Sequence, residues 1–317
     1  MRAFIIPDFG QPGSVGERPR PEPSDGQLLV RVDVAGVTPM DAVYGTGMFK
    51  AYMEHRLPLT PGTDYAGTVV AVGPGVEGFA VGDEVFGDVG KLHVGEGSFA
   101  EYVTAAAANA THRPPSIPVA IAAVLPRSAT TALEAVDALH ATDGDHVAVI
   151  GAGGGIGSFA TEFATRRGLR VIAVTRPENF DYVRELGAAD VIDYTSGDVV
   201  EELRSRHPAG LAGILDLYHD AAGLAPFAAA VRPDGWLVSP LARGAEEAIV
   251  GTAVHVHITG IPYQRAPEVV ELLAQQPTSV AVEVLPLDQA SDALAREATR
   301  QVRGKLALGI DQMEGER

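Results

Sequence analysis

The stretch His146–Gly157 reads HVAVIGAGGGIG and joins a short apolar run to a cluster of glycines. Val147, Val149 and Ile150 are β-branched residues of the kind that fills a buried strand. After the glycines, apolar residues recur at helical spacing, which places one face of a helix against a sheet. These apolar positions are Ile156, Phe159, Ala160, Phe163 and Ala164. The stretch therefore predicts a strand, a glycine turn and a helix in direct succession.

The spacing of the glycines indicates what this turn can bind. GxxGxxG fits at Gly151, Gly154 and Gly157, whereas GxGxxG fits only with Ala152 in the first position. Because glycines carry no Cβ, backbone N–H groups can approach a pyrophosphate, and the helix N-terminus adds positive partial charge. We therefore predict a dinucleotide site; the alternative is a tight strand–helix turn without a ligand. The predicted phosphate-binding residues are Gly151, Gly154, Gly155, Ile156 and Gly157.

Composition narrows the class of protein. The chain has 317 residues, 46% hydrophobic and 21% charged, which is typical of a globular protein of about two domains. It has no cysteine, so disulfides and thiolate zinc sites are excluded. The net charge of −17 disfavours nucleic acid, and no apolar run approaches the roughly 18 residues of a membrane helix. The start of the chain lacks a signal-peptide core, so we expect a cytoplasmic protein without nucleic-acid or membrane partners.

The first part of the chain, residues 1–118, has the pattern of a β-rich domain. Short strands are predicted at Leu28–Val34, Thr68–Val72 and Phe99–Val103, separated by glycine and proline, as in a small barrel or sandwich. Residues 10–26 are rich in glycine, proline and charge and predict a surface loop.

Residues 119–264 alternate between strand and helix patterns, which predicts βαβ units and a doubly wound parallel sheet in an α/β domain. After this segment a helix is predicted at Glu268–Ala274, followed by strands at Val280–Leu285 and Lys305–Ile310. The polar tail 311–317 is expected to fray.

Several motifs together resemble the medium-chain dehydrogenase/reductase superfamily, and within it the zinc-free quinone oxidoreductase-like enzymes. They occur in the family's order over nearly the whole chain. The matching segments are AGVTPMD at 35–41, PGTDYAG at 61–67, GSFAEYV at 97–103, LGAAD at 186–190 and GK at 304–305. Their number and order make the resemblance far more specific than the glycine turn alone.

The resemblance implies the architecture and the assembly. It implies a GroES-like barrel domain formed by residues 1–118 and completed by 265–317, with a Rossmann domain at 119–264. It also implies a nicotinamide cofactor in the cleft between the domains, a small-molecule substrate and a homodimer.

The same resemblance indicates whether this chain binds a metal ion. Zinc-dependent relatives place a cysteine and a His-Glu pair where this chain has Thr38, Thr63 and Asp64. Two hydroxyls and one carboxylate make a poor site for a soft metal, so we predict none. We interpret Asp64 as a structural hydrogen-bonding carboxylate, with a catalytic base as the alternative.

The end of the second predicted strand indicates which nicotinamide cofactor is bound. An NAD site offers an acidic residue there, whereas this chain has Thr175 and Arg176. A hydroxyl and a guanidinium suit a 2′-phosphate, so we predict NADPH. Asn179 stands where many NADPH relatives have a lysine, and the alternative is that Arg176 is only a solvated surface residue. Thr131 and Asp220 are further predicted cofactor contacts, because they fall where the family has such contacts.

Without zinc, hydrogen-bond donors must stabilise the oxyanion that forms when hydride reaches an enone or quinone. The catalytic candidates are Tyr44, Tyr65 and Thr38, with Thr131 also considered, and the tyrosines are preferred as substrate-side donors. An ordinary cleft-lining role is the alternative for each.

The predicted function is therefore a zinc-independent, NADPH-dependent reductase of a quinone or an activated C=C. The alternatives are a non-redox biosynthetic enzyme, such as a cyclase, on the same fold, and a nucleotide-binding protein without catalysis.

Overall fold

The computed structural model describes residues 1–310, so the predicted frayed tail 311–317 lies outside the described residues. The chain forms two compact units. Unit 1 comprises Met1–Arg127, Tyr263–Pro277 and the chain from Ala281 onward, and unit 2 comprises Ser128–Pro262 and Thr278–Val280. Over residues 1–310, no helix has both the length and the apolar character needed to cross a bilayer.

Unit 1 is built on a seven-stranded sheet with the order β16-β17-β3-β5-β6-β9, and β8 also pairs with β3. The strands are β3 (Gln27–Val37), β5 (Asp64–Val72), β6 (Glu84–Asp88), β8 (Tyr102–Ala106), β9 (Ala110–His112), β16 (Val282–Pro286) and β17 (Lys305–Gly309). β17 pairs antiparallel with β3, with Leu306 opposite Val37, so the C-terminal segment completes a sheet begun near the N-terminus. Apolar side chains of these strands form one buried core, and the GroES-like domain is confirmed.

Two short pairs of strands complete the β structure of unit 1. β1 (Arg2–Ile5) pairs antiparallel with β2 (Ser14–Glu17), and β4 (Glu54–Thr60) pairs parallel with β7 (His93–Glu96). The prediction of a loop over residues 10–26 was wrong at β2, because this strand is held by β1 rather than by an apolar pattern of its own. The helices of unit 1 are α1 (Pro39–Tyr44), α2 (Val119–Ala122), α9 (Ala266–Gln275) and α10 (Ala290–Ala298).

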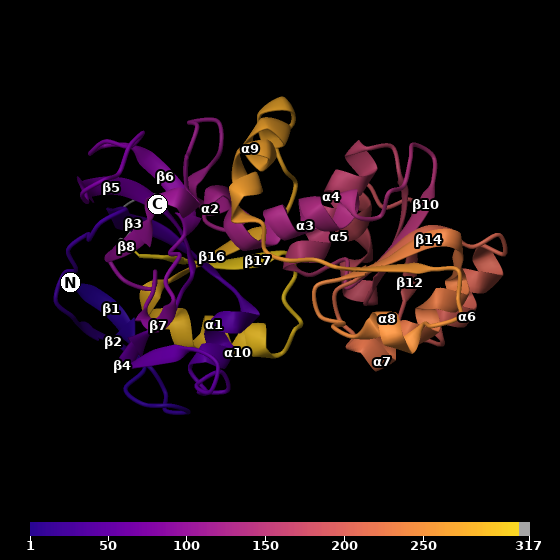
Figure 1. Cartoon of the computed structure of the whole chain (residues 1–317), viewed down its shortest axis with the longest axis horizontal. Coiled ribbons are helices and arrows are strands. Elements are labelled where there is room, and N and C mark those ends of the chain that lie inside the picture. The colour runs from indigo at the N-terminus through magenta and orange to yellow at the C-terminus, as the bar shows by residue number, and fades with distance from the viewer. Residues whose placement is uncertain (311–317) are drawn as a thin grey trace. The chain divides into compact units, whose positions relative to one another are not determined.

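Unit 2 contains six parallel strands in the order β12-β11-β10-β13-β14-β15. They are β10 (His146–Ile150), β11 (Arg170–Thr175), β12 (Asp190–Asp193), β13 (Leu211–Asp216), β14 (Val231–Ser239) and β15 (His255–Ile258). The helices are α3 (Thr130–Asp137), α4 (Gly155–Arg166), α5 (Phe180–Glu185), α6 (Val199–Arg206), α7 (Ala221–Leu224) and α8 (Ala245–Ala248). Figure 1 shows α4 on one side of this sheet and α6 and α7 on the other. The predicted doubly wound parallel sheet is confirmed.

The strand order of unit 2 reverses next to β10. The chain moves from β10 outward through β11 to β12, and then returns to β13 on the other side of β10. In open α/β sheets, ligands bind at the carboxyl ends of the strands where the order reverses. The glycine turn directly follows β10, so it lies at this position.

Candidate functional site

The turn after β10 has the backbone geometry that its glycines permit. Gly151 has a φ of +81°, which L side chains rarely adopt. A Cβ on Gly157 would lie 2.2 Å from the carbonyl oxygen of Gly151, so only glycine fits this close approach of helix and turn. Gly154 is the N-cap of α4 and supplies no side-chain cap, which leaves the first N–H groups of the helix available to an anion. The turn therefore fits the pyrophosphate of a dinucleotide.

The end of β11 lies beside this turn, because β10 and β11 are neighbours with Ile150 opposite Val174. Thr175 is buried, and its hydroxyl accepts a hydrogen bond from Asn179 Nδ2 at 3.3 Å. A Cβ on Gly153 would lie 2.6 Å from that amide nitrogen, so Thr175 and Asn179 pack directly against the glycine turn. Arg176 follows Thr175 and is half-buried. The structure thus places Thr175 against the turn, and Arg176, the other residue predicted to contact a 2′-phosphate, directly follows it in the chain.

The two other predicted cofactor residues make structural contacts within unit 2. Thr131 is buried in α3, and its hydroxyl lies 3.5 Å from the carbonyl oxygen of Gly260. The Asp220 carboxylate caps α7 by accepting a hydrogen bond from Gly223 N at 2.9 Å. Their roles toward a nucleotide stay predictions.

Sequence reasoning missed a paired histidine near Asp220. Asp216, at the end of β13, is fully buried, and its Oδ2 lies 2.7 Å from His219 Nδ1. This hydrogen bond raises the pKa of His219 above its usual value. The Asp-x-x-His spacing after a predicted strand was the available signal.

Unit 1 contains a buried charged cluster formed by Arg127, Asp64 and Asp88. Arg127 Nη2 lies 3.0 Å and Nε 3.2 Å from Asp88 Oδ2. Arg127 Nε also lies 3.4 Å from Asp64 Oδ1, and its backbone N–H donates to Asp64 Oδ2 at 3.3 Å. The guanidinium of Arg127 therefore forms ion pairs with two buried carboxylates, Asp64 and Asp88. The expectation that Asp64 is a hydrogen-bonding carboxylate agrees with these contacts.

Burial controls the protonation of this cluster. Burial raises the pKa of Asp64 to about 7, although the positive charge of Arg127 acts in the opposite direction. The two carboxylates in turn raise the pKa of Arg127 although burial opposes this, so the guanidinium stays charged. Asp64 is consequently partly protonated near neutral pH, while Arg127 keeps its positive charge.

The cluster opens onto a cavity of about 290 Å³ whose lining residues all belong to unit 1. Arg127, Asp88, Tyr44 and Tyr263 line it. Burial raises the pKa of both tyrosines, so both hydroxyls keep their protons at neutral pH. This part of the cavity wall therefore offers the guanidinium of Arg127 and the hydroxyl groups of Tyr44 and Tyr263.

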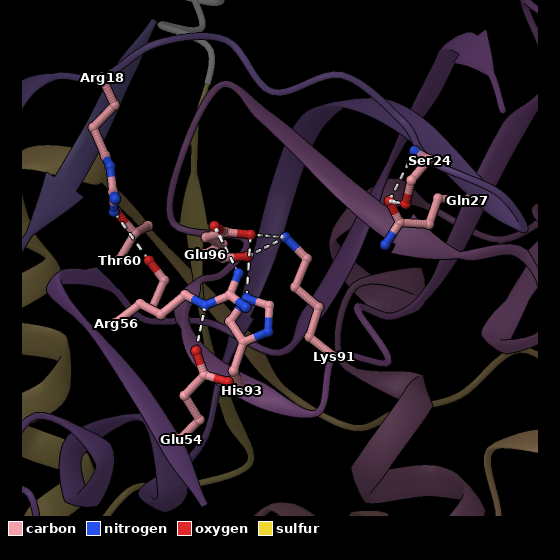
Figure 2. A network of polar contacts seen from close by, with 10 residues as sticks. Arg18, Ser24, Gln27, Glu54, Arg56, Thr60, Lys91, His93 and Glu96 are labelled. Atoms are coloured by element: carbon pink, nitrogen blue, oxygen red, sulfur yellow. Dashed lines mark hydrogen bonds and ion pairs between the residues drawn. The ribbon is translucent and has the colours of Figure 1, made fainter.

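Another part of the wall comes from β7 and the segment before it, through Lys91, His93 and Glu96. Figure 2 shows these side chains converging on the Glu96 carboxylate, with Arg56 on its other side. Lys91 Nζ lies 3.0 Å and His93 Nε2 lies 3.2 Å from Glu96 Oε2. Burial opposes ionisation of Glu96, but the hydrogen bonds from Lys91 and His93 outweigh it and lower the pKa of this carboxyl to about 2.

The three predicted catalytic residues are not brought together. Tyr44 lines the cavity, but Tyr65 is completely buried among the core residues of unit 1 that include Leu59 and Phe99. Thr38 is also buried, and its hydroxyl donates to Asp41 Oδ2 at 2.7 Å as part of the cap of α1. Tyr65 and Thr38 are absent from the lining of this cavity, and their contacts are those of packing and capping residues.

The residues at the zinc positions of metal-dependent relatives do not fit a zinc ion. The Thr38 hydroxyl is engaged by Asp41, and Asp64 is paired with the guanidinium of Arg127, whose positive charge opposes a metal cation. Among residues 1–310, no group of three or more histidine, aspartate or glutamate side chains is arranged to hold a metal ion.

Comparisons with known proteins agree with this architecture. The family model for the alcohol dehydrogenase GroES-like domain matches residues 24–115, and the model for zinc-binding dehydrogenases matches residues 155–271. Together the two models cover more than half of the chain.

Relatives with curated names are similar over a large part of the chain. A chloroplastic quinone oxidoreductase of Triphysaria versicolor is 33% identical over 61% of this chain and 61% of that protein. A chloroplastic NADPH-dependent alkenal/one oxidoreductase of Arabidopsis thaliana is 32% identical over 76% of this chain and 62% of that protein. The chain thus spans about three fifths of the length of these relatives.

A solved structure extends the similarity to nearly the whole fold. A mycobacterial protein in complex with NADPH is 25% identical, with a TM-score of 0.84 over 98% of this chain and 100% of that one. The family models, the named relatives and this structure agree with the sequence motifs. The chain belongs to the medium-chain dehydrogenase/reductase superfamily, whose oxidoreductases bind nicotinamide cofactors.

Proposed function

We propose that this chain is a zinc-independent, NADPH-dependent oxidoreductase that reduces a quinone or an activated C=C by hydride transfer. The observation that carries the proposal is the uncapped N-terminus of α4 at a glycine turn that packs against Thr175. The names of the Triphysaria and Arabidopsis relatives support the redox class and the two kinds of acceptor. The NADPH-bound mycobacterial structure supports the cofactor.

Each unit would contribute its own part of the reaction. In unit 2, the turn residues Gly154 and Gly157 allow the backbone to approach the pyrophosphate, and Arg176 binds the 2′-phosphate. A bound NADPH supplies the hydride, so the protein mainly positions and polarises the reactants. In unit 1, the cavity that Tyr44 and Arg127 line receives the acceptor.

Zinc independence rests on the donor chemistry of the cluster. Asp64 is held by the Arg127 guanidinium and by the backbone N–H of the same residue, so its oxygens are already engaged by a cation and a donor. A protein with this pairing would polarise the acceptor with a side-chain hydrogen-bond donor rather than with a metal ion. Dialysis against a chelator should leave the activity unchanged.

The test is NADPH oxidation, followed by the loss of the reduced cofactor's near-ultraviolet absorbance, against a panel of quinones and enones. Turnover with at least one acceptor is expected. No turnover with any acceptor would contradict the proposal, and a product of unchanged mass formed without NADPH consumption would support the non-redox alternative. The homodimer and the cytoplasmic location stay predictions, which sedimentation and cell fractionation can test.

A further inference from the structure

The ion pairs of Arg127 do not by themselves explain why its side chain borders a cavity. Its hydrogen bonds to Asp88 use Nε and Nη2, which leaves Nη1 as the guanidinium nitrogen that this carboxylate does not hold. Only 16% of the side chain is exposed, and the residue lines the cavity of unit 1. A guanidinium that is nearly excluded from water but borders a cavity interacts strongly with a negative charge that develops there.

The local backbone supports a functional reading of this position. Arg127 lies in the π-helical turn Leu125–Ala129, just before α3. Single π-helical turns are rare in proteins and occur frequently at functional sites. This turn also directs the backbone N–H of Arg127 to Asp64, so main chain and side chain are anchored by the same carboxylate.

The part of the cavity wall around Arg127 combines aromatic rings with a charged donor. The guanidinium carbon lies 5.6 Å from the ring centroid of Tyr263, and Tyr44 lines the same cavity. The two aromatic rings provide apolar surface, whereas the guanidinium provides a charged donor. A planar conjugated carbonyl compound combines the two kinds of surface that this wall offers.

We propose that Arg127 is a catalytic residue that binds the carbonyl oxygen of the acceptor and stabilises the oxyanion formed on it. The inference rests on the proposed hydride-transfer function. The hydride adds to the electrophilic carbon of the acceptor, the displaced π-electron pair moves to the carbonyl oxygen, and the cofactor leaves oxidised. A solvent proton then completes the reduced product. Arg127 contributes the positive charge that a metal ion supplies in zinc-dependent relatives.

Partial protonation of Asp64 helps the guanidinium in this role. Since burial raises the pKa of Asp64 to about 7, Arg127 is not fully neutralised by two ionised carboxylates at neutral pH. The part of the positive charge of Arg127 that the carboxylates do not compensate can then act on the oxygen of the acceptor.

Kinetics of Arg127 variants separate this role from a structural one. Arg127→Met should lower kcat about 100-fold or more, as the loss of an oxyanion donor does, with a smaller rise in KM, because the neutral carbonyl oxygen is bound less strongly than the oxyanion. Arg127→Lys keeps a cation for Asp64 and Asp88 but loses the planar fork, so it should retain an intermediate kcat. The matched control is Arg296→Met, which removes an exposed arginine paired with Glu283 outside the cavity and should leave kcat unchanged.

A binding measurement on the unmodified protein keeps the inference testable if the variants do not fold. 4-Nitrophenol is the probe, because it is planar and its phenolate resembles the proposed oxyanion and absorbs visible light. The bound probe should ionise at a lower pH than the free probe, and Arg127→Lys should reduce this difference. An unchanged or raised pKa of the bound probe, or no binding at all, would overturn the inference.

The two proposals fail in different ways. If the protein shows no turnover with any acceptor but shifts the ionisation of 4-nitrophenol through Arg127, then the redox proposal is wrong and the oxyanion site stands. If turnover occurs and folded Arg127→Met retains the kcat of the unmodified protein, then the redox proposal stands and the inference is wrong.

Discussion

The Nη2 atom of Arg127 lies 3.0 Å from Oδ2 of Asp88, although 39 residues separate them in the chain. Both side chains are largely buried, with exposed fractions of 16% and 6%. Burying charged groups is costly unless each has a partner, so the guanidinium and the carboxylate depend on one another.

Asp88→Asn should therefore destabilise unit 1. A hydrogen bond to a charged group contributes about 1.5–3 kcal/mol, and the free energy of unfolding should fall by about this amount, because loss of the Asp88 charge favours ionisation of Asp64, which then compensates Arg127. Urea denaturation at neutral pH measures the change. The matched control is Glu283→Gln, which breaks an exposed pair with Arg296 and should cost no more than about 0.5 kcal/mol. Equal losses of unfolding free energy in the two variants would contradict a stabilising role for the buried Arg127–Asp88 pair.

The raised pKa of Asp64 predicts a specific pH dependence of stability. A carboxyl whose pKa is higher in the folded than in the unfolded state holds its proton more tightly when folded. The stabilisation that protonated Asp64 gives to the folded state is fully present below the usual carboxyl pKa near 3.8, and it is lost as the pH rises through about 7. The stability of the unmodified protein relative to Asp64→Asn should therefore fall between about pH 4 and pH 7 and then level off. Urea denaturation of both proteins across this range tests it, and a pH-independent difference would show that Asp64 is ionised throughout.

Glu96 predicts the opposite pH dependence. Its pKa is lowered to about 2, so its ionised form stabilises the folded state above the usual carboxyl pKa near 4.5. This contribution is lost as the pH falls through about 2. Glu96→Gln should be less stable than the unmodified protein at pH 7, and the difference should shrink on acidification, as thermal unfolding can measure. Glu54→Gln is the control, since Glu54 pairs only with Arg56 in the network of Figure 2 and is fully exposed to solvent. A larger loss in Glu54→Gln would contradict the network around Glu96.

The glycine turn allows nucleotide binding and folding to be separated. A Cβ at Gly154 meets only the Gly151 carbonyl oxygen, at 3.4 Å, so Gly154→Ala should fold normally. Its methyl group would stand where the phosphates approach the N-terminus of α4, so NADPH affinity should fall roughly tenfold or more. Gly157→Ala should reduce both stability and binding, because its Cβ would lie 2.2 Å from the Gly151 carbonyl oxygen.

Gly197→Ala is the control for this pair, since its Cβ would meet nothing within 4 Å. Thermal unfolding and fluorescence titration with NADPH measure the two properties. Undiminished NADPH affinity in Gly154→Ala would show that the nucleotide does not bind at this turn.

Local patterns predicted much of the fold. The apolar run of β10 and the glycine spacing after it identified the turn, because both depend on neighbouring residues. The strand–helix alternation likewise predicted the parallel sheet of unit 2. The strand β2 was missed because Ser14–Glu17 has no apolar pattern and forms by pairing with β1, a partner that its own residues do not reveal.

The candidate site in unit 1 was harder to predict. Asp64 and Tyr65 are adjacent in β5, and neighbouring residues of a strand point to opposite faces. Asp64 reaches Arg127, so Tyr65 points into the core, and the two could not both have faced one cavity. Arg127 itself was not singled out, because its importance comes from Asp64 and Asp88, which approach it only through the pairing of β5 with β6.

The most direct test of the central claim is a calorimetric titration of the unmodified protein with NADPH and with NADH. We predict that NADPH binds more tightly than NADH, and that Arg176→Ala weakens NADPH roughly 10- to 100-fold, because it removes a charged hydrogen bond to the 2′-phosphate. Equal affinities for the two nucleotides would refute the preference for NADPH. If neither nucleotide, reduced or oxidised, produced heat or a thermal shift, the assignment of a nicotinamide site to the turn after β10 would be contradicted.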